Sequence, residues 1–170
     1  MDVIKAGARP LCPEEVCVGT PIVLASDNAG YELKHYVEQY LDACGVEWID
    51  CNPEEGVAKH YPEWAHKAAQ TIMEGKAKSG ILICGTGIGI GIAAMKCPGI
   101  YAARCDDAVT ARLARQQLDV NMLTFGQRVT GFGVALEMVY EFLRTPFDEA
   151  NSENVRRIKA AEKQFLKEAE

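Results

Sequence analysis

The chain of 170 residues is long enough to bury the core of one domain, and its 18 basic and 24 acidic residues give a net charge of −6. That balance argues against nucleic acid or an anionic membrane as the main partner, because both attract basic proteins. No apolar run approaches the length that spans a bilayer. An anionic small molecule stays possible, because binding one depends on local groups rather than on net charge.

Seven cysteines are spread irregularly, with no C-x-x-C pair and no zinc-like spacing to the three histidines. The first twenty residues also lack the apolar core of a secretory signal. We therefore predict reduced thiols, no metal site and a cytoplasmic protein. Prolines and a glycine without any periodicity predict that residues 1–20 form a flexible extension, followed by one domain over residues 21–170.

Apolar runs typical of buried strands lie at residues 21–26, 46–51, 80–84, 100–104 and 121–125. Helical patterns follow them at 33–44, 62–74, 92–96, 108–118 and 132–145, and an amphipathic pattern covers 152–169. This alternation predicts an α/β fold, namely a three-layer α/β/α Rossmann-like domain with a five-stranded parallel sheet and an added C-terminal helix. The expected strand order is 2-1-3-4-5.

The most informative stretch is the third predicted strand with the turn after it, residues 80–91. An apolar run ends at Cys84, and glycine then occupies alternate positions from 85 to 91. Such glycines let the backbone approach a ligand closely, and successive N–H groups can line a concavity for an anion. The start of the following helix adds partial positive charge. We expect this loop to hold a negatively charged group beside Cys84.

Familiar phosphate-binding motifs are absent from this loop. Ile90 stands where G-x-G-x-x-G needs its third glycine and where a C-x5-R phosphatase loop needs arginine. No Lys-Ser/Thr pair follows for a P-loop, and Cys84 stands where a phospho-receiver would carry aspartate. These differences argue against dinucleotide, nucleoside triphosphate and phosphatase functions, and we predict no cofactor.

In an open parallel sheet of the expected order, ligands bind beyond the carboxyl ends of strands 1 and 3. Those two ends carry Asp27-Asn28 and Cys84-Gly85-Thr86. A thiol at a strand end beside a helix start can act as a base. Thr86 adds a hydroxyl, and the loop N–H groups can stabilise an oxyanion. Together these groups indicate proton abstraction next to a carbonyl.

Four segments of the chain are distinctive, namely Cys-Gly-Thr-Gly-Ile-Gly at 84–89, Ser-Asp-Asn-Ala-Gly-Tyr-Glu-Leu-Lys at 26–34, His-Tyr-Pro at 60–62 and Asn-Met-Leu-Thr-Phe-Gly-Gln-Arg at 121–128. They resemble the ribose-5-phosphate isomerase B family, which also includes galactose-6-phosphate isomerase subunits. The resemblance covers about residues 21–160. It implies a metal-free aldose–ketose isomerase that acts on a phosphosugar through an enediol, in a homodimer or homotetramer with composite active sites.

The resemblance also assigns roles to individual residues. Cys84 matches the base at the C2 proton, and Thr86 matches the hydroxyl that assists proton transfer at the substrate oxygens. Asp27 matches an acid that binds sugar hydroxyls and helps ring opening. Tyr61 matches an aromatic residue near the sugar, and Arg128 matches a basic residue that reaches the phosphate across the dimer. The further substrate-binding positions that it implies are Asn28, Gly85, Gly87, Ile88, Gly89, Gln117, Leu118, Arg156 and Arg157.

The chain departs from the family at positions linked to ring opening. Asn28 and Gln117 stand where the family has histidine, Leu118 replaces an asparagine, and residues 149–154 replace a Gly-Gly-Arg-His segment. A glutamine cannot act as a general acid near neutral pH. The leading hypothesis is isomerisation of ribose 5-phosphate. The alternatives are another phosphosugar, such as galactose 6-phosphate or a tetrose phosphate, a non-autonomous subunit, and a phosphosugar-binding protein.

Overall fold

The computed structural model describes residues 11–52 and 60–168 of the chain. Its strands are β1 (Ile22–Ser26), β2 (Trp48–Asp50), β3 (Ser79–Cys84), β4 (Ala102–Arg104) and β5 (Met122–Gly126). Its helices are α1 (Tyr31–Ala43), α2 (Tyr61–Met73), α3 (Ile88–Ala94), α4 (Ala108–Leu118), α5 (Phe132–Arg144) and α6 (Ser152–Glu168), with a short 3-10 turn, η2 (Glu149–Asn151). The alternation of strand and helix predicted from the sequence is confirmed.

The strands form one all-parallel sheet in the order β2-β1-β3-β5-β4, which corrects the expected order 2-1-3-4-5 at its last two positions. Burial gives the physical reason. All five residues of β5 are buried, whereas the three residues of β4 are partly or fully exposed. The more apolar strand takes the interior position, because burial there removes more apolar surface from water.

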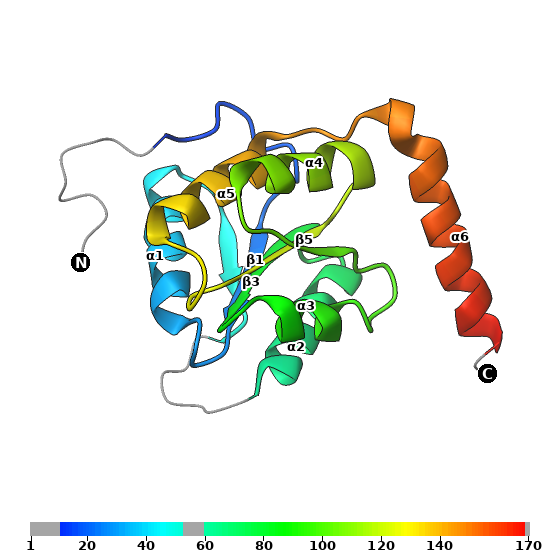
Figure 1. Ribbon diagram of the computed structural model, residues 1–170, viewed down its shortest axis with the longest axis horizontal. Helices are drawn as coiled ribbons and strands as arrows, with labels where there is room; N and C mark the ends of the chain where they lie inside the picture. The colour runs from blue at the N-terminus through cyan, green and yellow to red at the C-terminus, as the bar shows by residue number, and fades with distance from the viewer. Residues whose placement is uncertain (1–10, 53–59, 169–170) are drawn as a thin grey trace.

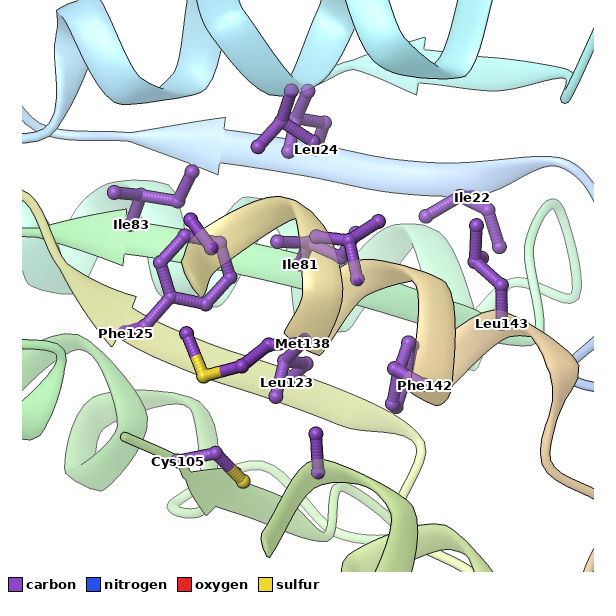
Figure 2. Close-up of a cluster of buried hydrophobic side chains, with 14 of the residues drawn as sticks. Ile22, Leu24, Ile81, Ile83, Cys105, Leu123, Phe125, Met138, Phe142 and Leu143 are labelled. Carbon is purple, nitrogen blue, oxygen red and sulfur yellow. The ribbon is translucent and has the colours of Figure 1, made fainter. Parts of the chain in front are cut away.

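Helices α1, α4 and α5 cover one face of the sheet, and α2 and α3 cover the other (Figure 1). The larger core lies on the first face, where Ile81 and Phe125 of the sheet meet Met138 and Phe142 of α5 (Figure 2). Side chains alternate between the two faces along each strand. Cys84 accordingly belongs to the second face, in a cluster with side chains of α2 and α3.

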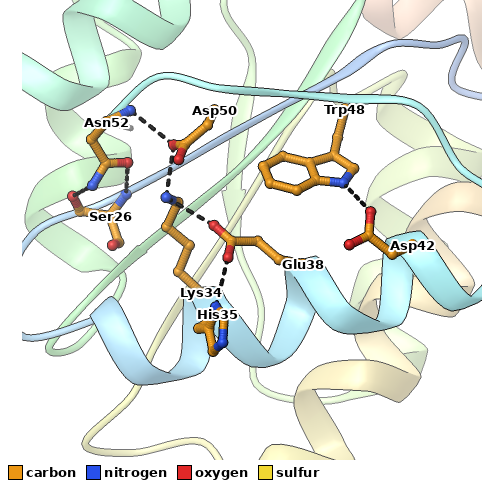
Figure 3. A network of polar contacts seen from close by, with 8 residues as sticks. All are labelled: Ser26, Lys34, His35, Glu38, Asp42, Trp48, Asp50 and Asn52. Carbon is orange, nitrogen blue, oxygen red and sulfur yellow. Dashed lines mark hydrogen bonds and ion pairs between the residues drawn. The ribbon is translucent and has the colours of Figure 1, made fainter. Parts of the chain in front are cut away.

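A polar network ties α1 to the ends of β1 and β2 (Figure 3). The buried Lys34 ammonium pairs with Glu38 at 2.9 Å and with Asp50 at 2.7 Å. The Asp50 carboxylate also accepts the Asn52 N–H at 2.9 Å. The Asn52 side chain bonds both the N–H and the carbonyl of Ser26, at 3.2 and 2.9 Å. Because Ser26 ends β1, this network fixes the strand end that leads into the candidate site.

Residues 11–20 are attached to the domain by covalent and packing contacts, and residues 1–10 of the expected extension lie outside the described residues. A disulfide joins Cys12 to Cys44 at the end of α1, so these two cysteines are not the reduced thiols that we expected. Val18 is buried in the larger core, and the Cys17 N–H donates to a carbonyl of α5 at 2.7 Å. The partners of the disulfide are separated by 32 in sequence, so only the packing of this segment against α1 brings them together.

Helix α6 stands at one end of the molecule (Figure 1). Val155 is buried, but Ile158, Phe165 and Leu166 are exposed. The Tyr101 hydroxyl donates to a carboxylate of α6 at 2.8 Å. Within residues 11–52 and 60–168, no helix has both the length and the apolar character that a membrane span needs.

Candidate active site

The candidate site is built around the turn between β3 and α3. Cys84 ends β3 with 5% of its surface exposed, and its Sγ accepts the Gly87 N–H at 3.1 Å. An N–H donor at this distance interacts more strongly with a negatively charged acceptor than with a neutral one. Gly87 has a φ of +78°, and a Cβ there would lie 2.6 Å from the Phe125 backbone. Only glycine fits this position.

Strand β5 holds the turn in place. The Thr124 hydroxyl donates to the Gly87 carbonyl at 2.9 Å. Two N–H groups just beyond β5 donate to the carbonyls of Cys84 and Gly85, at 2.9 and 3.0 Å. These contacts exist because β5 lies directly beside β3, so the corrected strand order is what supports the turn.

Asp27 follows β1 and reaches the same edge of the sheet. Its N–H donates to the Ile83 carbonyl at 3.3 Å, which ties the two strand ends together. Its carboxylate accepts the N–H groups of Ala29 and Gly30 at 3.0 and 3.1 Å. Burial raises the pKa of the Asp27 carboxyl, and these N–H groups and the Arg128 cation oppose that rise. A carboxyl of this kind can exchange protons with sugar hydroxyls.

We expect Asp27→Asn to raise the melting temperature at pH 7 by about 1–2 °C while it lowers activity roughly 10- to 100-fold. A carboxyl whose pKa is raised by folding stabilises the protein when protonated, and that contribution is lost as the pH rises through the folded-state pKa. The asparagine avoids this loss and can still accept both N–H groups. The gain in melting temperature should vanish when the pH is below the pKa of an aspartate in the unfolded chain. Scanning calorimetry from pH 3 to 8 measures it, and equal melting temperatures at pH 7 would contradict it.

Tyr61 and Arg128 lie over two glycines of the turn. A Cβ at Gly89 would lie 2.9 Å from the Tyr61 ring, and a Cβ at Gly85 would lie 3.3 Å from the Arg128 Nε. Tyr61 begins α2, and 40% of its surface is exposed. The sequence-predicted residues that the structure brings to this edge are Asp27, Asn28, Tyr61, Cys84, Gly85, Thr86, Gly87, Ile88, Gly89 and Arg128. Their roles stay predictions.

Sequence reasoning missed Arg104, the last residue of β4. Its Nε donates to the Thr86 carbonyl at 3.0 Å, and its guanidinium pairs with Asp106. A basic residue at the carboxyl end of a predicted strand was the available signal. No group of three or more His, Cys, Asp or Glu side chains among the described residues is placed to hold a metal ion.

The family model described as Ribose/Galactose Isomerase matches residues 22–161. The chain belongs to this family. Ribose-5-phosphate isomerase B of Escherichia coli strain K12 is 39% identical over 127 residues, which cover 75% of this chain and 85% of that protein. The solved ribose-5-phosphate isomerase B of Clostridium thermocellum is 38% identical with a TM-score of 0.81, and the match covers 85% of this chain and 98% of that one.

A third relative is named for a different substrate. The 4-deoxy-4-sulfo-D-erythrose isomerase of Clostridium sp. strain MSTE9 is 40% identical over 131 residues, which cover 75% of this chain and 81% of that protein. Proteins similar to this ribose/galactose isomerase family member are therefore named for a five-carbon phosphosugar and for a four-carbon sulfosugar.

Four residues matched to the ribose/galactose isomerase family lie away from Cys84. Gln117 and Leu118 end α4, which runs from the carboxyl edge of the sheet to its amino edge, and both are exposed. Arg156 and Arg157 lie on α6, where both pair with Glu153. One chain therefore does not bring these four side chains to the turn.

Proposed function

We propose that the protein is an aldose–ketose isomerase of a phosphorylated sugar, and that it interconverts ribose 5-phosphate and ribulose 5-phosphate. The observation that carries this proposal is the Cys84 thiol at the end of β3, bonded by the Gly87 N–H and flanked by Asp27. Membership of the ribose/galactose isomerase family supports it, because two of the three named relatives are ribose-5-phosphate isomerases.

In the proposed mechanism, the Cys84 thiolate removes the proton from C2 of the aldose and returns it to C1. Charge develops on the substrate oxygens in the enediolate, where backbone N–H donors of the turn stabilise it. The Thr86 hydroxyl passes the O2 proton to O1, so C1 and O1 gain the two protons that C2 and O2 lose. Asp27 bonds the sugar hydroxyls and takes part in ring opening.

We also propose that two copies of the chain form each site, in a homodimer or homotetramer. The separation of Gln117 and Arg157 from Cys84 within one chain supports this, because a second chain can supply them. Mixing tests it: chains with Cys84→Ala and chains with both Arg156→Ala and Arg157→Ala should regain about a quarter of the activity when their subunits exchange. No recovery in mixed dimers would contradict a composite site.

The cytoplasmic location stays a prediction. It was inferred in part from reduced thiols, and Cys12 and Cys44 are joined in a disulfide.

Proton NMR in D2O tests the activity on a panel of ribose 5-phosphate, ribulose 5-phosphate, galactose 6-phosphate and erythrose 4-phosphate. We expect deuterium to enter at C1 or C2 of the best substrate, with the largest kcat/KM for the ribose pair. Binding without exchange on the whole panel would overturn the isomerase and favour a non-autonomous subunit or a phosphosugar-binding protein.

A four-carbon, open-chain substrate is the second candidate. The similarity to 4-deoxy-4-sulfo-D-erythrose isomerase favours it. So do Asn28 and Gln117, since neither amide can act as a general acid to open a ring near neutral pH. A sugar that cannot close a furanose ring needs no such acid. A kcat/KM at least about tenfold higher for four-carbon substrates than for ribose 5-phosphate would establish this candidate over the first.

A further inference from the structure

We propose that Arg104 is a positioning residue for Cys84, because its guanidinium strengthens, through the Thr86–Gly87 peptide, the hydrogen bond that stabilises the thiolate. The inference rests on the proposed function, in which that thiolate is the base. It gives a role to a side chain that the sequence motifs leave out.

The two hydrogen bonds share one peptide group. The Arg104 Nε donates to the Thr86 carbonyl oxygen at 3.0 Å, and the Gly87 N–H donates to the Cys84 Sγ at 3.1 Å. The Thr86 carbonyl and the Gly87 N–H belong to the same planar unit and point in opposite directions in a trans peptide. A charged donor therefore sits at the oxygen end of this dipole, and the sulfur sits at its hydrogen end.

A cation at a carbonyl oxygen polarises the amide, so its N–H becomes a better donor. Bonds from an ionised donor are also stronger than bonds between neutral groups. Cys84 and Gly87 are both buried, so water screens the bond between the Gly87 N–H and the Cys84 Sγ poorly. The stronger N–H favours the thiolate, which is the form that acts as a base.

Arg104 is held in place for this role. Its guanidinium pairs with Asp106, and only 31% of its side chain is exposed. The Thr86 backbone is fixed from the β5 side, where a Cβ at Gly126 would lie 2.3 Å from it. The peptide between Arg104 and Cys84 is thus confined on two sides.

Three other charged or titratable side chains surround the turn, namely Asp27 after β1, Tyr61 on α2 and Arg128 after β5. The Asp27 carboxylate disfavours a nearby thiolate, and the Arg128 cation favours one. Among the described hydrogen bonds, the Arg104 Nε donates to the Thr86–Gly87 peptide, and none of these three side chains does.

The test is the pH profile of Cys84 alkylation by iodoacetamide in the full-length protein. Mass spectrometry of the Cys84 peptide separates this thiol from the free cysteines 17, 51, 97 and 105. Arg104→Met removes the charge and the donor at similar length. We expect it to move the profile to higher pH by roughly half a unit, and to slow alkylation at pH 7 about threefold. Arg104→Lys keeps a cation and a donor and should restore most of the wild-type profile.

Asp106→Asn is the matched control, because it removes the partner of Arg104 and leaves the Arg104 charge. Its profile should stay in place or move to lower pH. A shift of the alkylation profile to higher pH in this control would overturn the inference. An unmoved profile in Arg104→Met, with only a lower melting temperature and kcat, would also overturn it and would leave Arg104 with a structural role. The failure of the proposed function looks different, because deuterium exchange would then be absent from the whole substrate panel, or would persist in Cys84→Ala if another group is the base.

Discussion

Cys84→Ser should lower deuterium exchange at C1 or C2 of the substrate by a factor of about 10³ or more, while the Kd for ribulose 5-phosphate stays within about threefold. The serine hydroxyl fits the space and can accept the Gly87 N–H. It is not ionised near neutral pH, however, and is therefore a poor base. NMR in D2O measures the exchange, and titration calorimetry measures the Kd.

Cys51→Ser is the matched control for this variant. Cys51 is a buried free thiol just after β2, where its Sγ lies 3.7 Å from the Thr71 hydroxyl. The sequence after it, Cys-Asn-Pro, lacks the alternate glycines that follow Cys84, so we expect exchange at the wild-type rate. If Cys84→Ser kept more than about a tenth of the wild-type exchange rate, Cys84 would not be the base.

Gly87→Ala should both destabilise the fold, by about 3–5 kcal/mol, and remove the exchange activity. The added Cβ would lie 2.6 Å from the Phe125 backbone, which cannot rotate away as a side chain can. The positive φ adds strain for any residue with a Cβ. Relief of the contact would displace the Gly87 N–H from Cys84. Urea unfolding measures the stability, and deuterium exchange into the substrate at the same protein concentration measures the activity.

Gly75→Ala separates the strain of the positive φ from the clash. Gly75 has a φ of +73°, but nothing lies within 4 Å of the position of its Cβ. We expect this variant to lose about 1–2 kcal/mol and to keep its activity. Equal losses of stability in Gly87→Ala and Gly75→Ala would show that the close approach of the turn to β5 does not add to the cost of the Gly87→Ala substitution.

Much of the fold could be predicted from local patterns. The run from Ile22 to Ser26 and the run from Ser79 to Cys84 are continuously apolar or small, and both are buried along their whole length. Gly45 and Gly75 follow the ends of α1 and α2 with positive φ, as stop signals do. These features depend on neighbours in the chain, so periodicity and glycine positions were enough to find them.

The site could be predicted only in part. Asp27 and Cys84 were found because they follow strands that are adjacent in either strand order. Arg104 was not found, because its contact with Thr86 depends on how the turn and β4 are placed in space. Gln117 was expected near Cys84 because of the resemblance to the isomerase family. Within one chain the topology places the two residues at opposite edges of the sheet.

The sequence by itself determined the parallel α/β architecture, the turn at residues 84–87 and its pairing with Asp27, because each follows from burial and backbone freedom along short stretches. Tertiary structure alone decided that β5 rather than β4 lies beside β3. It also decided that Cys12 meets Cys44 and that Arg104 reaches the Thr86–Gly87 peptide. The physical reason is that distant segments compete for the same buried positions. The outcome depends on how much apolar surface each segment can bury, and no local pattern records that comparison.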